Sequence, residues 1–573
     1  MNLKLRFLRY KWIQSVLIGL FCALFSLSLW LFGLMDMWEG KTWDWRASLM
    51  AEPSSSTDRI CLILVDQTSL EWMSKNNGLN WPWPREIYSV VVDFCKRVQA
   101  KALAFDVLFT EPSSYGVEDD ASFSKSVAEY GTVASAAFLK QSGNLSASIQ
   151  SESTDNKFFS PITLKGLKSW KETRAGKACL FTNAAMPIPE LVPASAVICN
   201  VQQEPDPDAI YRRVRMVGIS DNQVFPCLGL GIYFAGKNRE TLDSSDAFTG
   251  TIGQAGLNID KRTIKLDKKG EAILRYRGPS GTHKTYSAAS IIASEIEFRN
   301  RADKSNSPVD SDSLSKNDQT LGKQNSSIDL SYFKDKYVFF SLSAPGLFDL
   351  RSSPVDSVYP GVEIQATILD NFLEGDFIRD VPKYSASLFA ILCSILCAVC
   401  ISSVKGVIPL IFIAGASVII PAAISVILYI AGFWLPLVVQ ETAVVLTVIF
   451  SLGLNYLHEG RQRRFIKNAF SQYLSPVFIE QLIEHPEKLK LGGERKELSI
   501  FFSDLEGFTS ISERLSPEEL TSLLNKYLSA MTEIIHQEGG TVDKYEGDAI
   551  IAFWNAPLDV PDHGACAVRA ALR

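Results

Sequence analysis

The sequence reveals its fold class most clearly at residues 407–433, which read VIPLIFIAGASVIIPAAISVILYIAGF. None of these 27 residues carries a charge. An uncharged helix of ~20 residues is long enough to cross the ~30 Å hydrocarbon core of a bilayer. A buried helix of a soluble domain explains the stretch less well, because a soluble helix of this length keeps a polar face toward water. We therefore predict a membrane-spanning helix here.

Three further apolar stretches of similar length are predicted to span the membrane, at 12–35, 384–404 and 434–457. Basic residues precede the first stretch and follow the last, and such residues favour the cytoplasmic side. Residues 1–11 and the chain after the fourth span are therefore expected in the cytoplasm, and residues 36–383 outside it. A cleaved signal peptide is the alternative for the first stretch, but its apolar part would be shorter, ~7–15 residues.

The overall composition pools a membrane part with a polar part. Hydrophobic residues make up 47% and aromatic residues 11% of the 573 residues, which excludes a disordered chain. The formal net charge is −6, from 57 basic and 63 acidic side chains, so no basic excess indicates nucleic-acid binding. The length exceeds the ~250–300 residues at which single cores stop growing, and so predicts several domains.

The long segment between the first two spans has the pattern of a mixed α/β domain. Short apolar strands and one helix are expected at 60–65, 87–98 (the helix), 102–105 and 337–343. Strands that alternate with helices predict a largely parallel sheet. Two polar stretches, 141–157 and 299–329, are expected to be flexible surface insertions.

Three passages of this segment resemble the CHASE type-2 sensor domain, an extracellular module of bacterial receptors. They are VDQTSL at 65–70 followed by WPWPR at 81–85, AFDVLF at 104–109, and YPGVE at 359–363. The resemblance covers roughly 36–383. It implies a sensory domain with an unidentified extracytoplasmic ligand, in a protein of the bacterial inner membrane.

Two aspartates directly follow predicted strands of this domain, Asp66 and Asp106. Carboxylates at the carboxyl edge of a parallel sheet can bind a ligand. They can equally well cap the helices that follow them, and the sequence leaves both interpretations open. Trp81 and Trp83 stand between prolines, which favours a rigid packing loop over a ligand cage.

The segment 461–494 connects the last span to the C-terminal domain and is expected to be helical. Ser475 followed by Pro476 is typical of the start of a second helix. We expect this element to couple the membrane part to the next domain, with a plain spacer as the alternative.

Two carboxylates mark the expected site in the C-terminal region. An apolar strand at 498–502 runs into SDLEGFT at 503–509, which places Asp504 at the end of the strand. Asp548 lies in a turn between two further predicted strands, and a strand–helix–hairpin layout brings it beside Asp504. Carboxylate oxygens suit hard cations such as Mg²⁺. Either aspartate alone is more typical of a turn, but the pair predicts a two-metal site.

The start of the following helix supplies a candidate phosphate site. Backbone N–H groups at Gly507, Phe508 and Thr509 are expected to contact the phosphates of the substrate, because N–H groups at a helix N-terminus bind anions. Such an arrangement holds a divalent metal beside a phosphate.

The region 497–573 resembles the catalytic domain of class III nucleotide cyclases, both in SDLEGFT and in KYEGD, which ends at Asp548. The resemblance implies an α+β ferredoxin-like fold and active sites formed between the two domains of a homodimer. It also implies two divalent metal ions, Mg²⁺ or Mn²⁺, held by Asp504, Asp548 and the carbonyl of Leu505. Lys544 matches the position that selects adenine, so ATP is the expected substrate, with cyclic AMP and pyrophosphate as products.

The sequence departs from this family in one respect. The family domain extends well beyond the length that follows Glu497, and its second base-contacting Asp and transition-state Asn and Arg have no counterpart here. We therefore expect a C-terminally incomplete cyclase domain that is inactive by itself, in a multi-domain membrane receptor. A receptor whose cyclase-like domain serves only dimerisation is the alternative. A sensor histidine kinase fits less well, because His536 ends a helix.

Overall fold

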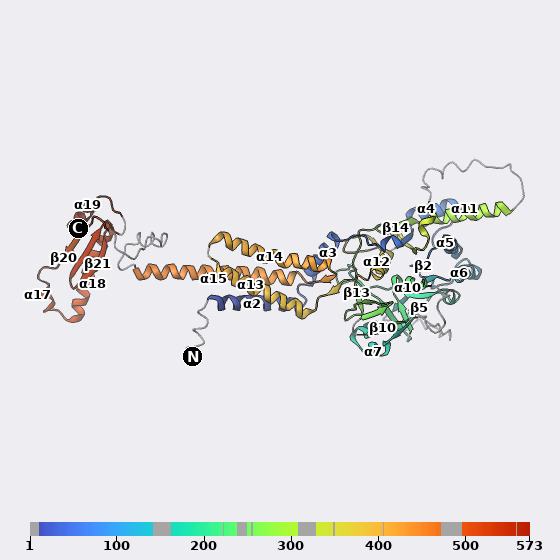
Figure 1. The fold of residues 1–573 in the computed structure, drawn as a ribbon, viewed down its shortest axis with the longest axis horizontal. Helices are drawn as coiled ribbons and strands as arrows, with labels where there is room; N and C mark the ends of the chain where they lie inside the picture. The colour runs from blue at the N-terminus through green and yellow to red at the C-terminus, as the bar shows by residue number, and fades with distance from the viewer. Residues whose placement is uncertain are drawn as a thin grey trace. The chain divides into compact units, whose positions relative to one another are not determined.

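The computed structural model describes residues 11–140, 162–221, 223–237, 249–253, 256–306, 328–347, 350–404, 406–470, 495–556 and 559–573. It forms two compact units, whose elements are labelled in Figure 1. One unit comprises Gly19–Leu396 and Phe412–Val445, and the other comprises Met1–Ile18, Cys397–Ile411 and Leu446–Arg573.

Three predicted features fall wholly or partly outside the described residues. They are the insertion at 141–157, most of the insertion at 299–329, and the greater part of the coupling element at 461–494. The first residues of the second insertion are helical, because α11 (Ala288–Asn306) extends into it.

Four helices in the described part of the chain are long and apolar enough to cross a membrane. They are α2 (Lys11–Leu31), α13 (Lys383–Ser403), α14 (Val407–Ile430) and the first part of α15 (Val438–Phe470). Large apolar side chains point outward from them, and Phe21, Phe412 and Ile427 are 63%, 75% and 63% exposed. Apolar faces of this extent suit contact with lipid and not with water.

The ends of these helices differ by a few residues from the predicted spans. Gly33 and Gly432 adopt left-handed φ angles of +77° and +84°, just after α2 and α14 end. Phe433 and Trp434, expected at the ends of two spans, form the short strand β19 instead. Beyond its apolar part, α15 continues as one helix to Phe470, into the predicted coupling element.

A parallel sheet forms the core of the large domain, which we define as Asp36–Asp380. Its strands lie in the order β14-β1-β15-β2-β3-β5, and β6 also pairs with β3. They are β1 (Ile60–Val65), β2 (Ala102–Phe105), β3 (Val133–Lys140), β5 (Asn183–Ala185), β6 (Val197–Asn200), β14 (Lys284–Ser287) and β15 (Tyr337–Leu342). Only the pairing of β3 with β5 is antiparallel. The predicted strands at 60–65 and 102–105 and the largely parallel sheet are thus confirmed.

Helices cover both faces of this sheet because its strands are apolar on both faces. In β1, Cys61, Ile63 and Val65 pack toward one face, and the intervening residues pack toward the other. The first face is covered by α4 (Gln67–Asn77), α5 (Arg85–Arg97), α6 (Val117–Tyr130), α9 (Leu191–Ala194) and α11. The second is covered by α10 (Leu228–Ala235) and α12 (Gly361–Glu374).

Smaller elements complete the large domain. Strands β4 (Thr163–Lys165), β10 (Thr249–Gly253), β11 (Gly256–Ile259) and β12 (Arg262–Ile264) form one sheet. The pairs are β7 (Arg213–Arg215) with β13 (Glu271–Ile273), β8 (Val217–Ser220) with β9 (Gln223–Pro226), and β16 (Leu350–Arg351) with β17 (Tyr359–Pro360). The remaining helices are α3 (Asp36–Leu49), α7 (Leu167–Lys171) and α8 (Arg174–Ala178).

One fully buried charge of the large domain lies on α12. Asp370 is fully buried and accepts hydrogen bonds from Ser54 Oγ (2.7 Å), Thr57 Oγ1 (2.6 Å) and Arg277 Nε (2.7 Å). His283 Nε2 lies 3.5 Å from the same carboxylate. Burial alone would raise the pKa of Asp370, but contacts with His283, Arg277 and the two hydroxyls lower it to about 2. The network therefore joins two separate segments to α12.

The base of the large domain is fastened to the apolar helices. Strand β18 (Arg379–Asp380), just before α13, pairs in parallel with β19 (Phe433–Trp434), between α14 and α15. The carboxylate of Glu39 accepts from the N–H groups of Leu437 (2.9 Å) and Val439 (3.0 Å), which satisfies the start of α15. Trp43 packs edge-on against Trp434, with ring centroids 5.3 Å apart.

The C-terminal domain is a three-stranded antiparallel sheet in the order β20-β22-β21, with two helices on one face. Its elements are β20 (Ser499–Ser503), α17 (Phe508–Ser512), α18 (Pro517–Gln537), β21 (Thr541–Glu546), β22 (Ala549–Trp554) and α19 (His563–Leu572). Trp554 is fully buried between the sheet and the helices, beside Ile535 and Ala570. This core fixes the strand ends on which the candidate site is built.

We predict that Asp370→Asn lowers the midpoint of thermal unfolding of the large domain by about 5–10 °C, because one partner of a buried ion pair is removed. A folded-state pKa below the ordinary value of ~3.9 means that the ionised carboxylate stabilises the fold above that value, and that this stabilisation is lost as the pH falls toward 2. The difference in unfolding midpoint between Asp370→Asn and wild type should therefore become smaller below pH 4.

Differential scanning fluorimetry of the purified chain at pH 7, 5 and 3 measures both effects. The matched control is Asp93→Asn, which removes a partly exposed carboxylate that pairs with Arg299, and its midpoint should stay within about 2 °C of wild type. Equal midpoints for Asp370→Asn and wild type at pH 7 would contradict the role given to the network.

Candidate functional site in the C-terminal domain

One glycine determines the conformation of the turn between β20 and α17. The strand ends at Ser503, and Gly507 adopts a φ of +71°, a left-handed conformation that favours glycine, directly before α17. Within this turn the N–H of Phe508 donates to the carbonyl oxygen of Leu505 at 3.2 Å. The Leu505 carbonyl keeps a second lone pair for another partner. By contrast, the N–H of Phe508, predicted to contact phosphate, is already used inside the turn.

The two predicted carboxylates lie at the same end of the sheet. Ser503 pairs with Ile550 across the antiparallel β20–β22 ladder, so Asp504 leaves β20 beside the residue at which β22 begins. Asp548 occupies the tight β21–β22 turn, in which Gly547 has a φ of +67°. The N–H of Leu505 donates to Asp548 Oδ2 at 3.2 Å and ties the two turns together.

These side chains remain accessible to a ligand. Asp504 is exposed and Asp548 is half-buried. Two carboxylates and the nearby carbonyl of Leu505 offer only oxygen donors, which is the set that hard divalent cations prefer. No group of three or more His, Cys, Asp or Glu residues with the arrangement of a complete metal site occurs in the described residues.

Lys544 lies on β21 next to an irregularity in the ladder. The register shifts between Val542 and Lys544, and Lys544 then pairs with Ile551. Its side chain is exposed and makes no ion pair with any residue that the structure describes. Its ammonium group is therefore available to contact a base.

The face of the sheet opposite α18 and α19 is open and apolar. Ile500 and Phe502 alternate with the inward-facing Phe501 on β20, and they are 61% and 71% exposed. Ile551 and Phe553 pair with them across the ladder and are half-buried. Side chains of this size are rarely left exposed together without a covering surface.

The two aspartates of the large domain have different roles in the structure. Asp66 is the N-cap of α4, and its Oδ1 accepts from the N–H of Ser69 at 2.7 Å, as the capping interpretation requires. Asp106 instead lines a cavity together with Trp81, whereas Trp83 is buried. Sequence reasoning missed Arg351 and Gln365, which line the same cavity, because no local motif marks them.

Two family models match this chain. The family model described as CHASE2 domain matches residues 17–402, from the first apolar helix into the second. The model described as adenylate and guanylate cyclase catalytic domain matches residues 493–573, which include Asp504, Lys544 and Asp548.

Individual relatives match only a part of this chain. Adenylate cyclase 1 of Rhizobium meliloti (strain 1021) is 33% identical over 104 residues, which are 18% of this chain and 16% of that protein. An adenylate cyclase of Anabaena cylindrica is 36% identical over 111 residues, 19% of this chain and 21% of that protein. The match thus covers about a fifth or less of each of these relatives.

Among solved structures, the guanylyl cyclase Cya2 is 41% identical, with a TM-score of 0.14, and the match covers 14% of this chain and 42% of that one. The family assignment rests on the two domain models, the first of which covers more than half of the chain. The chain belongs to the CHASE2 family and joins this domain to an adenylate and guanylate cyclase catalytic domain, the composition of a receptor-type class III cyclase.

Proposed function

We propose that this chain is part of a membrane-bound adenylate cyclase that converts ATP to 3′,5′-cyclic AMP and pyrophosphate under the control of its CHASE2 domain. The convergence of Asp504 and Asp548 at one end of the sheet, tied by the hydrogen bond from Leu505 N–H, is the observation that carries the proposal. Two of the matched relatives are named as adenylate cyclases, which supports the choice of ATP.

The donor set of the site fits two divalent metal ions, Mg²⁺ or Mn²⁺. Asp504, Asp548 and the carbonyl of Leu505 would hold them, since all three provide hard oxygen ligands. Ions bound there would lower the pKa of the ribose 3′-hydroxyl and offset the negative charge that develops on the leaving pyrophosphate. The two turns fix the carboxylates before substrate arrives, so little reorganisation is needed when charge develops.

The reaction joins the ribose 3′-oxygen to the α-phosphorus of ATP. The bond between the α-phosphorus and the oxygen that bridges to the β-phosphorus breaks, and pyrophosphate leaves. Lys544 selects the base, because its ammonium group donates to the ring nitrogens of adenine and offers no acceptor for the N–H groups of guanine. The loop at Gly507 and Thr509 lies beside the carboxylates and contacts the phosphates.

The open face of the C-terminal sheet supports a homodimer. Ile500 and Phe502 present an apolar surface that a second copy of the domain would remove from water. In this proposal each active site forms between the two copies.

The arrangement in the membrane follows from the basic residues at both ends of the membrane part. In the proposal Arg461, Arg463 and Arg464 place the C-terminal domain in the cytoplasm of a bacterial cell, with the large domain outside the inner membrane. Four apolar helices give an even number of crossings, which agrees with a cytoplasmic N-terminus as well.

We predict that the full-length protein makes cyclic AMP from ATP and that Asp504→Asn or Asp548→Asn lowers kcat by on the order of 10³-fold, because each loses a charged oxygen ligand. Glu506→Gln is the matched control, since it removes an exposed carboxylate two residues from Asp504 and should retain activity within about threefold. Cyclic AMP is quantified with purified protein in Mn²⁺ and in Mg²⁺. A wild-type protein without cyclase activity would favour a receptor whose cyclase-like domain only dimerises.

We further predict that Lys544→Glu loses most activity toward ATP, because a carboxylate cannot donate to adenine and an unmet hydrogen bond costs ~1–3 kcal/mol. Activity toward GTP should rise little, since the second base contact of the family is unchanged. Lys526→Glu makes the same charge change on the exposed side of α18 and serves as the control. Equal ATP cyclisation by wild type and Lys544→Glu would show that Lys544 is an ordinary solvated strand residue.

A further inference from the structure

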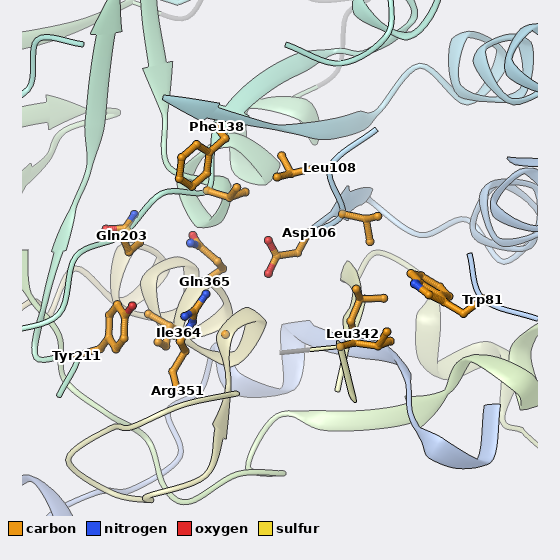
Figure 2. Close-up of a pocket in the computed structure, with 14 residues that line it drawn as sticks. Trp81, Asp106, Leu108, Phe138, Gln203, Tyr211, Leu342, Arg351, Ile364 and Gln365 are labelled. Carbon is orange, nitrogen blue, oxygen red and sulfur yellow. The ribbon is translucent and has the colours of Figure 1, made fainter. Parts of the chain in front are cut away.

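The large domain contains a cavity of about 420 Å³ that the cyclase chemistry does not use. It lies where β2 and β15 end, with Asp106 and Leu342 in its wall (Figure 2). Ligands of α/β domains bind outside the carboxyl ends of parallel strands, and small-molecule sites occupy roughly 300–1,000 Å³. Both its position and its size therefore suit one small organic molecule.

The cavity carries one charge of each sign. Asp106 follows β2 and its carboxylate points into the cavity, while Arg351 of β16 points in from another wall (Figure 2). The Arg351 guanidinium carbon lies 6.0 Å from the centre of the Tyr211 ring, so an aromatic face positions it. A ligand with a single charge complements only one of these two side chains.

A buried amide adds a hydrogen-bond donor beside Arg351. Gln365 of α12 is 3% exposed, and its Oε1 accepts from the N–H of Gly229 at 2.9 Å. That bond orients the amide, and Figure 2 shows the end of the Gln365 side chain directed toward the cavity. The amide nitrogen Nε2 is a hydrogen-bond donor, so a ligand that carries an acceptor would complement it.

The rest of the wall is apolar and aromatic. Trp81 and Leu342 line the side of the cavity away from Gln365, and Phe138 lines the wall above Gln365, as Figure 2 shows. Trp81 is held against the buried Trp83, with ring centroids 5.5 Å apart. A rigid aromatic wall of this kind favours an apolar group on the ligand.

We propose that this cavity binds a free α-amino acid with an apolar side chain. Arg351 and the amide of Gln365 bind the carboxylate of the amino acid, Asp106 binds its ammonium group, and the side chain packs against Trp81. A zwitterion is the simplest small molecule that places a group of opposite charge beside each of these two side chains. The site is separate from the cyclase site and does not depend on the proposed reaction.

Gln365 lies on the helix that connects the cavity, through β18, to α13. Gln365 lies on the first half of α12, and Asp370, one turn and a residue further along, lies in the buried ion network. The chain then passes through β18 directly into α13. An amino acid that orders Gln365 therefore acts on the helix that leads to the second membrane span.

Equilibrium dialysis of the purified chain in detergent tests the proposal with three probes, L-leucine, L-phenylalanine and L-tryptophan. At least one should bind with a Kd of ~1 mM or lower. Two analogues of phenylalanine serve as controls: phenethylamine lacks the carboxylate, and 3-phenylpropanoate lacks the amine. If phenylalanine binds, each analogue should bind at least about tenfold more weakly than phenylalanine. If phenylalanine does not bind, neither analogue should bind. The analogue arm uses the wild-type chain and so does not depend on the folding of a variant.

Asp106→Asn and Arg351→Gln should each weaken binding of that amino acid at least about tenfold. Asp66→Asn is the matched control, because Asp66 follows a neighbouring strand at the same sheet edge, caps α4 and does not line the cavity. The affinity of the Asp66→Asn variant for the amino acid should equal that of the wild-type chain. Absence of binding by all three amino acids, equal binding of an analogue, or equal losses in the Asp66 variant would each overturn the proposal.

Discussion

The carboxylate of Asp370 is the interaction on which the large domain depends. It is fully buried, and an isolated charge there would be costly, so the surrounding chain must provide donors. Ser54 and Thr57 arrive from the loop before β1, and Arg277 arrives from the segment before β14. The partners come from two parts of the chain, each next to a strand of the sheet, so the network fixes α12 relative to the sheet.

This constraint acts on three consecutive stretches of the chain that have different roles. The first half of α12 forms a wall of the cavity, its second half carries the buried ion pair, and the chain then enters the membrane part through β18. The helix has polar anchors at both of its ends, since Gln365 also accepts from the N–H of Gly229. Both ends of α12 are therefore held to other segments of the large domain.

Strands and turns with a local sequence pattern could be predicted from the sequence. Sites built from segments that are distant in the sequence could not. Fully apolar runs such as 60–65 and 102–105 predict buried strands, and SDLEGFT predicts the turn that holds Asp504. The cavity could not be predicted, because Asp106, Arg351 and Gln365 lie in separate segments and meet only after the sheet has formed. Helix ends were missed by a few residues, since glycine turns and β19 interrupt the apolar runs in ways that hydropathy does not register.

The pairing of β18 with β19 has a mechanical consequence for the apolar helices. Backbone hydrogen bonds join the entrance of α13 to the connection between α14 and α15, and Glu39 fastens the start of α15 to α3. The ends of α13, α14 and α15 nearest the large domain are therefore tied to one another and to α3. Sliding of one of these helices past another at that level would break the β18–β19 backbone hydrogen bonds or the Glu39 contacts, so such sliding is opposed there.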